Sequence, residues 1–413
     1  MRRWPTNHDV EASNPEIVSQ HRESGVADQR VFCNQCETGL GSSIAGPGRR
    51  LSFEGLRTST LAGTSGELLR HKLLRHDTEE LDDLTWQIAW EEKKITCFGN
   101  VGQGNSGTVQ KCVLEGCGSV FAVKVSILYS LRYRTGGLLT KQQTLIADSG
   151  VIPRKGILQE WKISKRCSSP FICRYYGFFV NESQGTSHIS MEYCEGGSLY
   201  QLTSRARGQG RRIEENILRK IADSVLRGLT YLESRNIIHC DLKPGNILFT
   251  RRGQIKLCDF GASVEGNAEG EAKLFTGSFC YMSPERVQGL TYTIRSDVWS
   301  LGISLLETAH NQHPFSTEKS GSNTRYSAFD LITLITSHSP PRLFSGDVTV
   351  GDQDIFWSTT AQDFIDCCLE KSSATRPGPM ELLKHPWFVP IENSEVDLIN
   401  FLRIVWDWPD CQT

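Results

Sequence analysis

Hydrophobic and polar positions divide the chain into three stretches with different patterns. Residues 1–78 are rich in Ser, Gly, Thr, Asn and charged residues, and their apolar periodicity is poor. A segment of this composition buries too little apolar surface to offset its chain entropy, so we expect a disordered N-terminal extension. Residues 79–94 are highly charged around Leu81, Trp86 and Trp90, which predicts a short helix or capping segment packed on the domain that follows.

From Ile95 onward the apolar segments are dense, short and separated by turn residues. They predict strand, glycine-rich turn and strand over 95–110, further strands at 120–125 and 187–192, and a helix over 158–166. After Glu214 the apolar positions recur with helical spacing. We therefore expect an α+β fold with two lobes in one unit spanning 95–389. The β-rich small lobe would cover about 95–193 and the α-rich large lobe about 194–389.

The composition of the 413 residues is that of an ordinary globular protein, with 38% hydrophobic and 22% charged residues. Lys plus Arg is 45 and Asp plus Glu is 47, and the net charge of −2 gives no reason to expect nucleic acid or an anionic membrane as a partner. The sequence shows no secretory signal and no apolar run of about 18 residues, so we expect no membrane span and a cytoplasmic or nuclear protein. The 14 scattered cysteines are then expected to be reduced thiols.

The glycine-rich turn is a candidate phosphate-binding loop. Its sequence fits G-x-G-x-x-G-x-V, and glycine lets backbone N–H groups approach phosphate oxygens closely. A dinucleotide-binding motif would continue as a helix and place an acidic residue near position 125, but Thr108 continues a strand and Val125 is apolar. The predicted nucleotide contacts in this stretch are Val101, Gly102, Gln103, Gly104, Asn105, Ser106, Gly107, Thr108 and Val109.

A lysine interrupts the apolar strand that follows. Lys124 comes after Phe121, Ala122 and Val123 in a pattern like V-A-I-K, and an ammonium group is costly to bury without partners. The expected partners are the phosphates of ATP and a carboxylate from a helix, and Glu160 is the candidate carboxylate. The alternative for Glu160 is a solvated helix residue, because the separation of 36 positions (124 to 160) is abnormal for this pairing.

The most specific pattern is Ile238–Leu248, which fits H-x-D-L-K-P-x-N. Asp241 is the candidate residue that accepts or orients the proton of a substrate hydroxyl, and Lys243 would offset the charge of the transferred phosphoryl group. Asn246 is a candidate Mg²⁺ ligand, and Asp259, in an Asp-Phe-Gly motif 18 positions after Asp241, is the second. These residues predict a phosphoryl-transfer site that uses ATP and Mg²⁺.

Three residues further along the chain have predicted structural roles. Glu285 follows Ser-Pro, and Arg376 precedes Pro377. We expect these two residues to form a buried ion pair, and we expect Asp297 to hold the backbone of the catalytic loop.

With these motifs in place, residues from about 80 to 408 resemble the MAP kinase kinases, most closely those of the fungal cell-integrity branch. The segments that carry the resemblance are 172–177, 192–199, 281–286 and 292–299. The resemblance implies a bilobal protein kinase of dual specificity that phosphorylates the Thr and Tyr of a T-x-Y loop in a MAP kinase, with a MAP kinase kinase kinase upstream. It also implies a gatekeeper and hinge contacts, and the remaining predicted nucleotide contacts are Ala122, Lys124, Met191, Glu192, Cys194 and Ser198.

The C-terminal segment 390–413 contains apolar positions with helical spacing between Val396 and Trp406. In the family, a segment after the kinase core docks the upstream kinase. Two interpretations therefore stay open for this segment: a docking helix, or a helix that simply packs on the large lobe.

Three departures from the family pattern bear on activity. An insert of about 126–150 matches nothing in the family, and it is either a surface loop or, in our hypothesis, a translated retained intron. An abundant mature transcript that encodes these residues would end that hypothesis. Cys240 replaces the Arg that usually pairs with an activation-loop phosphate, and 265–275 contains no Ser, Thr or Tyr, with Leu274 where an activating site would be.

The last two departures agree with each other, because a loop without a phosphate does not need the Arg that would receive it. We therefore expect activity to depend weakly on loop phosphorylation, with Glu265, Glu269 and Glu271 supplying standing negative charge. Two alternatives stay open beside an active MAP kinase kinase. One is a pseudokinase or scaffold of the same fold, and the other is a general Ser/Thr kinase outside the family.

Overall fold

The small lobe is built on a five-stranded antiparallel sheet with the strand order β1-β2-β3-β5-β4. Its strands are β1 (Ile95–Gly104), β2 (Gly107–Leu114), β3 (Val120–Ile127), β4 (Tyr175–Asn181) and β5 (Thr186–Glu192). The computed structural model describes residues 78, 81–104, 107–116, 118–127, 154–181, 183–274, 276–315, 327–344, 349–350, 353–354, 356–389 and 397–409. All of them belong to one compact unit, 58–413, and the predicted N-terminal extension otherwise lies outside the described residues.

The third strand corrects the predicted start of the insert. β3 continues through Ser126 and Ile127, where its register with β5 pairs Ser126 with Ser187 and Ile127 with Thr186. The side chain of Ser126 is buried, so this residue belongs to the sheet. The assignment of these two residues to an insert was therefore wrong, and the rest of the predicted insert lies outside the described residues.

The segment before the sheet forms helix α2 (Asp83–Glu91), as its apolar residues predicted. The side chain of Asp82 caps the helix by accepting a hydrogen bond from the Thr85 N–H at 2.7 Å. Trp86 is fully buried and meets the Phe121 ring edge-on, with 4.8 Å between ring centroids. The helix thus covers one face of the sheet with its apolar side and completes the core of the small lobe.

One helix connects β3 to β4 and contacts the large lobe through the pairing of Arg166 with Glu265. Helix α4 (Arg154–Arg166) starts before the predicted helix and ends at the predicted residue. Asp83 of α2 pairs with Lys165 of α4 at 2.6 Å and accepts a hydrogen bond from the Phe178 N–H at 3.0 Å. These contacts fix the position of α4 relative to the sheet, which matters because α4 carries Glu160.

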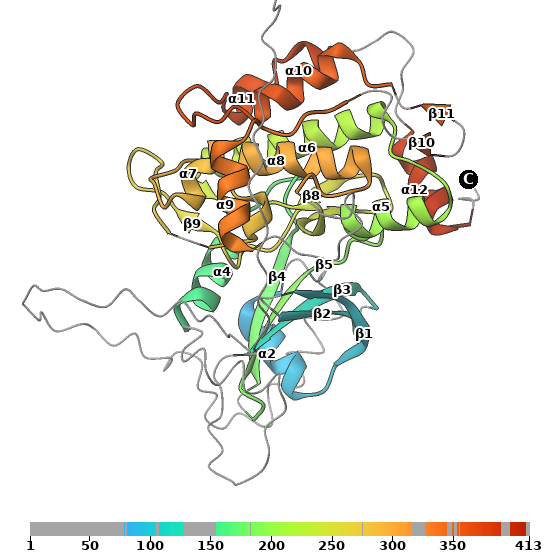
Figure 1. Cartoon of the computed structure of the whole chain (residues 1–413). Helices are drawn as coiled ribbons and strands as arrows, with labels where there is room; N and C mark the ends of the chain where they lie inside the picture. The colour runs from blue at the N-terminus through green and yellow to red at the C-terminus, as the bar shows by residue number, and fades with distance from the viewer. Residues whose placement is uncertain are drawn as a thin grey trace, which may run out of the picture. The chain divides into compact units, whose positions relative to one another are not determined.

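The large lobe is predominantly helical, and Figure 1 shows it above the small-lobe sheet, with α6 and α8 running side by side. Its helices are α5 (Leu199–Gly208), α6 (Glu215–Glu233), α7 (Pro284–Val287), α8 (Arg295–His310), α9 (Ala328–Ser337), α10 (Thr359–Cys368), α11 (Pro379–Leu382) and α12 (Leu398–Trp406). Short strand pairs join β6 (Ile237–Ile238) to β9 (Val264–Glu265), β7 (Ile247–Phe249) to β8 (Ile255–Leu257), and β10 (Thr349–Val350) to β11 (Gln353–Asp354). These pairs arrange the segment that carries the predicted catalytic residues.

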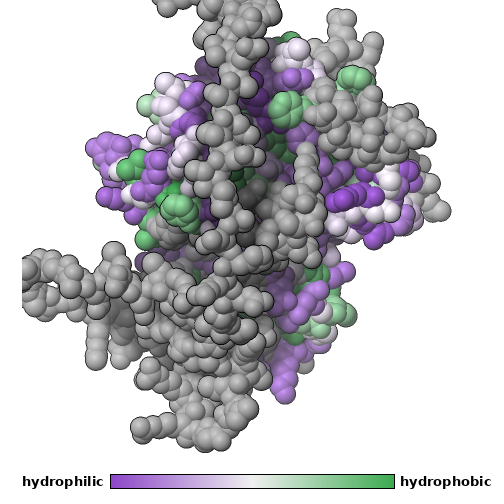
Figure 2. Space-filling model, in the orientation of Figure 1, coloured by the Kyte–Doolittle hydropathy of each residue, from purple (hydrophilic) through white to green (hydrophobic). Residues whose placement is uncertain are grey.

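Helix α8 forms the centre of the large lobe and is almost entirely buried. Three of its polar residues, Ser300, Ser304 and Thr308, donate their hydroxyls to carbonyls four residues earlier. This bonding satisfies hydroxyls that would otherwise be unpaired inside the core. Hydrophilic residues predominate on the described surface in Figure 2, with hydrophobic residues scattered among them. No helix in the described part of the chain is long and apolar enough to cross a membrane.

Candidate active site

Lys124 lies at the centre of a buried charge cluster that joins the two lobes. Its Nζ is 2.5 Å from Oε1 of Glu160 on α4 and 2.7 Å from Oδ1 of Asp259, which follows β8. The side chains of Lys124 and Glu160 are only 4% and 6% exposed. The predicted pairing of Lys124 with Glu160 is therefore present, and the alternative of a solvated Glu160 does not hold.

The attraction between Lys124 and the two carboxylates offsets the cost of burying these charges. Burial by itself lowers the pKa of Lys124, but the carboxylates of Asp259 and Glu160 outweigh it and hold that pKa above its usual value. Burial raises the pKa of Glu160, and the nearby ammonium of Lys124 opposes this change. The 2.5 Å contact between the two groups favours the ionised pair.

The catalytic loop brings together the other predicted residues. Asp241 Oδ2 accepts hydrogen bonds from Lys243 Nζ at 2.7 Å and from Asn246 Nδ2 at 3.1 Å. Asn246 Nδ2 also donates to the Asp241 carbonyl at 2.7 Å. Because the amide nitrogen makes both contacts, the amide oxygen of Asn246 is the atom available to a metal. Together with the Asp259 carboxylate it gives an all-oxygen donor set, which suits Mg²⁺.

Ser278, which was not among the predicted site residues, also belongs to this site. The Ser278 N–H donates to Asp241 Oδ1 at 2.7 Å, and Lys243 Nζ donates to Ser278 Oγ at 2.7 Å. Ser278 thus links the two polar side chains expected at the transferred phosphoryl group. The pattern Gly-Ser ahead of Ser-Pro-Glu was the available signal.

The neighbouring Gly277 has a structural reason to be glycine. Its φ is +94°, and a Cβ at this position would lie 2.2 Å from the Cys240 carbonyl oxygen. Any side chain would push the segment that carries Ser278 away from the catalytic loop.

Asp297 of α8 holds the backbone of the catalytic loop, as predicted. Asp297 accepts hydrogen bonds from the N–H groups of His239 at 2.7 Å and Cys240 at 2.9 Å. Cys240 has a left-handed backbone conformation with φ of 67°, so these two contacts and the bond from Arg286 Nη1 to its carbonyl, at 2.8 Å, fix an uncommon geometry. The loop is thus rigid immediately before Asp241.

The predicted ion pair between Glu285 and Arg376 is also present. It is bidentate, with distances of 2.7 Å and 3.0 Å, and Arg376 is fully buried. Arg376 donates further hydrogen bonds to the Glu370 carbonyl at 2.8 Å and the Arg295 carbonyl at 2.9 Å. These contacts tie the segment after the activation loop to the base of the large lobe.

The glycine-rich turn joins β1 to β2, with Gly102 opposite Val109 and Gly104 opposite Gly107. Gly107 has φ of +143°, and a Cβ there would lie 2.2 Å from the Val125 carbonyl oxygen, so the hairpin can pass close to β3 only with glycine at this position. The Val101 carbonyl accepts a hydrogen bond from Gln201 Nε2 of α5 at 3.3 Å. The predicted contacts Asn105 and Ser106 lie outside the described residues.

Three of the predicted nucleotide contacts, Ala122, Met191 and Glu192, lie on β3 and β5. They border the hinge, which is the segment 193–198 between β5 and α5. Ala122 is opposite Met191 in the sheet, and Met191 lines a small cavity together with Cys258 and Glu160. Glu192 Oε2 pairs with Lys256 at 3.1 Å, which leaves its backbone as the part that could contact a nucleotide.

The last two predicted nucleotide contacts, Cys194 and Ser198, lie in the hinge. Cys194 is buried, and its carbonyl accepts a hydrogen bond from the Gly197 N–H at 3.1 Å. Ser198 caps α5 by accepting from the Gln201 N–H at 3.3 Å, so its described role is structural.

Comparisons with known proteins agree with this geometry. The protein kinase domain family matches residues 95–388. The MAP kinase kinase skh1/pek1 of Schizosaccharomyces pombe is 40% identical over 328 residues, which cover 79% of this chain and 82% of that protein. The chain belongs to the MAP kinase kinase family of protein kinases.

Two further relatives extend the comparison. The mitogen-activated protein kinase kinase mkk2 of Aspergillus fumigatus is 42% identical over 334 residues, covering 81% of this chain and 62% of that protein. The dual specificity mitogen-activated protein kinase kinase dSOR1 of Drosophila melanogaster is 33% identical over 374 residues, covering 85% and 84%. The chain spans 59% to 65% of the length of three fungal relatives that it matches.

The activation segment of this kinase is held by contacts that need no phosphate. Arg166 at the end of α4 pairs with Glu265 of β9, and Gln159 Nε2 donates to the Ser263 carbonyl at 3.0 Å. Ser263 Oγ donates to the His239 carbonyl at 2.9 Å, and Thr276 Oγ1 donates to the Ala262 carbonyl at 3.0 Å. The hydroxyls that flank the predicted bare stretch therefore have structural partners.

Cys240 occupies an apolar environment instead of facing an anion. Its Sγ lies 3.7 Å from the Tyr292 hydroxyl, and it packs with Ile238, Val264 and Tyr292. Burial raises the pKa of the Cys240 thiol to about 12, so the side chain is neutral. A neutral buried thiol cannot receive an activation-loop phosphate.

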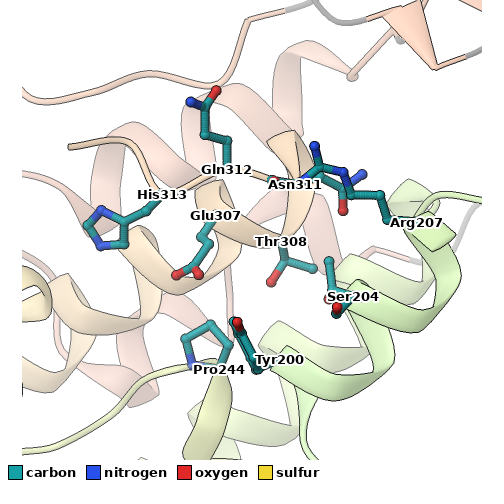
Figure 3. A pocket seen from close by; sticks show the side chains of 10 residues that line it. Tyr200, Ser204, Arg207, Pro244, Glu307, Thr308, Asn311, Gln312 and His313 are labelled. Atoms are coloured by element: carbon teal, nitrogen blue, oxygen red, sulfur yellow. Dashed lines mark hydrogen bonds between the residues drawn. The ribbon is translucent and has the colours of Figure 1, made fainter. Parts of the chain in front are cut away.

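A cavity of about 260 Å³ lies on the large lobe beside the catalytic loop (Figure 3). Tyr200 of α5, Pro244 of the catalytic loop and Glu307 of α8 line it, and His313 lies at one side. The Glu307 carboxylate accepts a hydrogen bond from the Tyr281 hydroxyl at 2.6 Å, and burial raises the pKa of Glu307. The described lining of this cavity includes none of the charged residues that surround Lys124 and Asp241.

The predicted C-terminal helix is α12, and its apolar face is buried against the large lobe through Leu398, Leu402 and Val405. Arg205 of α5 donates to the Val405 carbonyl at 2.5 Å and pairs with Asp407 at 2.7 Å. The geometry thus favours packing over docking for this face, because a partner could reach it only if α12 left α5.

Proposed function

We propose that this protein is an active MAP kinase kinase that transfers the γ-phosphate of ATP to the Thr and the Tyr of a T-x-Y loop in a MAP kinase. The observation that carries the proposal is the contact of Lys124 with both Glu160 and Asp259, at 2.5 Å and 2.7 Å. This contact aligns the small-lobe lysine, the helix carboxylate and the metal-binding carboxylate, which is the arrangement that phosphoryl transfer by kinases requires.

Each residue of the site has its own role in phosphoryl transfer. The substrate hydroxyl oxygen attacks the γ-phosphorus, the bond from the γ-phosphorus to the β,γ-bridging oxygen breaks, and ADP leaves. Asp241 orients the hydroxyl and receives its proton, while Lys243 offsets charge on the transferred phosphoryl oxygens. Lys124 orients the phosphates of ATP. Mg²⁺ held by Asn246 and Asp259 would supply further charge neutralisation.

The test is transfer to a catalytically inactive fungal MAP kinase, with phosphorylated residues mapped by mass spectrometry. The expected result is phosphate on both the Thr and the Tyr of the T-x-Y loop, lost in the Asp241→Asn variant. Equal signals from the two proteins would favour a scaffold that transfers no phosphate. Phosphorylation of general peptides but not of the MAP kinase would favour a Ser/Thr kinase with other substrates.

We also propose that this activity needs no phosphate on the activation loop. The pairing of Arg166 with Glu265 and the bond from Gln159 to the Ser263 carbonyl connect α4 to β9. These contacts support a position of α4 close to the catalytic residues. In other kinases, a phosphate on the activation loop supports this position of the helix. Treatment of the purified protein with a phosphatase should leave its activity within about twofold, and loss of activity would show that the proposal is wrong.

The relatives' names suggest the partners. We propose that a MAP kinase kinase kinase acts upstream and that both encounters take place in the cytoplasm or nucleus. Because the apolar face of α12 packs on α5, an upstream partner would use the exposed side of this helix, where Ile399 is 51% exposed. Co-purification with an upstream kinase that persists in Ile399→Ser would contradict this placement.

A further inference from the structure

Two cysteines face each other across the strands that carry the glycine-rich turn. The antiparallel register of β1 and β2 places Cys97 directly opposite Cys112. Side chains at directly opposed positions point to the same face of a sheet. Ile95 and Leu114, two positions further along each strand, are also opposed and both lie in the small-lobe core, which shows that this is the face covered by α2.

Opposed positions in an antiparallel pair meet the geometric requirement for a disulfide. Their Cα atoms are about 4.5 Å apart in a non-hydrogen-bonded pair and about 5.5 Å apart in a hydrogen-bonded pair. A disulfide requires about 4.4–6.8 Å between Cα atoms, so either kind of pair satisfies it. The β1 strand has a register shift directly after Cys97, which gives this end of the strand room to adjust.

Cys97 has the low pKa and the exposure typical of a redox-sensing cysteine, and Cys112 lies beside it as the candidate resolving cysteine. Cys97 is exposed, whereas Cys112 is fully buried in the core with Phe121 and Trp86. The neighbouring Cys112 thiol lowers the pKa of Cys97 to about 7, and Cys97 together with burial raises the pKa of Cys112, whose Sγ lies 3.9 Å from the Gln110 carbonyl oxygen. Cys97 is therefore partly ionised near neutral pH and accessible to solvent, while Cys112 stays protonated beside it.

We propose that Cys97 and Cys112 form a reversible disulfide when the protein meets a peroxide. The Cys97 thiolate attacks one oxygen of hydrogen peroxide, the O–O bond breaks, and Cys97 becomes a sulfenic acid as water is released. The Cys112 sulfur then attacks the Cys97 sulfur, the S–OH bond breaks, and a second water leaves with the Cys112 proton. The net reaction consumes two thiols and one peroxide and yields one disulfide and two waters.

The disulfide would lie at the end of the hairpin away from the glycine-rich turn. In the described register, Cys97 and Cys112 are followed by the pairs that lead to Gly102 opposite Val109. A covalent bond here fixes the register of the two strands. Disulfides in reducing compartments are typically transient and catalytic or redox-sensing, and both cysteines of this pair are free thiols in the structure.

The chain can be cut so that this pair is identified without ambiguity. Trypsin cleaves after Lys94, Lys111 and Lys124, which places Cys97 alone in peptide 95–111. Cys112 shares peptide 112–124 with Cys117, and a protease that cleaves after Glu115 separates those two cysteines. The purified full-length protein is titrated with hydrogen peroxide, its remaining thiols are alkylated, and the non-reduced digest is analysed by mass spectrometry.

The expected result is a peptide linking Cys97 to Cys112 that disappears after treatment with a thiol reductant. In Cys112→Val, Cys97 should remain a sulfenic acid that a 1,3-dicarbonyl probe traps several-fold more than in the native protein. In Cys97→Ser, an exposed substitution that keeps the core intact, Cys112 should stay unoxidised. Cys367→Ser, on α10, is the matched control and should leave the linked peptide unchanged.

Three outcomes would overturn the proposal. The first is a link from Cys97 to Cys117 in place of Cys112. The second is equal trapping of the Cys97 sulfenic acid in the native protein and in Cys112→Val. The third is oxidation of Cys97 to the sulfinic acid with no linked peptide at any peroxide concentration.

Discussion

Replacing Glu160 tests the charge cluster around Lys124 directly. Glu160→Gln keeps the size of the side chain and removes the carboxylate charge 2.5 Å from Lys124 Nζ, while the contact with Asp259 remains. A hydrogen bond to a charged group contributes about 1.5–3 kcal/mol net. In Glu160→Gln the charged Lys124 ammonium donates to a neutral amide oxygen, so this contact moves from the upper toward the lower end of that range. The charge of Glu160 therefore accounts for roughly 1–1.5 kcal/mol, which predicts an approximately tenfold lower kcat/KM.

Glu160→Ala removes the whole contact and leaves a buried ammonium with one carboxylate, so the loss should grow to about 1.5–3 kcal/mol, or roughly 10- to 150-fold. The matched control is Glu115→Gln, which makes the same chemical change in an exposed pair with Lys94. Exposed pairs contribute about 0.2–1 kcal/mol, so this control should lose less than about fivefold.

The assay is initial-rate transfer from ATP to an inactive T-x-Y MAP kinase, with thermal melting to show that each variant is folded. Glu160→Ala should be weakest, Glu160→Gln intermediate and Glu115→Gln close to the native protein. If Glu160→Gln and Glu115→Gln had equal kcat/KM, the buried contact would have no special role, and the reasoning from burial would be wrong.

Three further predictions concern stability and thiol chemistry. Arg376→Met should lower the free energy of unfolding by about 3–5 kcal/mol in denaturant titrations, because it leaves the buried Glu285 unpaired, and a loss below about 1 kcal/mol would contradict this. Burial lowers the pKa of His188 to about 4, so the stability that its neutral ring provides is complete above pH 6.5 and is lost as the pH falls toward 4. Between pH 7.5 and pH 5 the native protein should lose about 2 kcal/mol more unfolding free energy than His188→Phe, and parallel losses would refute the assignment. Alkylation of Cys97 should have its midpoint near pH 7, and a rate that rises only above about pH 8.5 would contradict the effect of the neighbouring Cys112 thiol on the pKa of Cys97.

The sequence was sufficient where a residue's role follows from its place in a motif. Lys124, Asp241, Asn246 and Asp259 were found because an ammonium in an apolar strand, or a carboxylate at a fixed distance from another motif, is compatible with few roles besides catalysis. The structure places them together across two lobes, with contacts of 2.5–3.1 Å.

The sequence was insufficient where a role depends on strand register or loop geometry. The pairing of Cys97 with Cys112 depends on how β1 and β2 align, and no local pattern fixes that alignment. Ser278 reaches Asp241 only because Gly277 adopts a left-handed conformation. β4 was not predicted as a strand, because its run Tyr175–Asn181 is apolar without alternation, and a short apolar run does not distinguish strand from helix.

The boundary of the predicted insert shows the same limit. Ser126 and Ile127 are a polar and an apolar residue directly after Val125, and the comparison with the family pattern assigned them to the insert. Their backbones continue the ladder with β5, and this ladder depends on a partner strand about 60 positions later along the chain. The pattern of the residues around Ser126 does not include β5, so it could not predict this pairing.

The most direct test of the central claim is the rate of γ-phosphate transfer by phosphatase-treated protein to an inactive T-x-Y MAP kinase. The native protein is compared with Asp241→Asn, a substitution that keeps the loop's shape and removes the carboxylate that orients the hydroxyl. The account predicts at least about 100-fold faster transfer by the native protein, as expected for loss of a general base. Equal rates for the two proteins would contradict it.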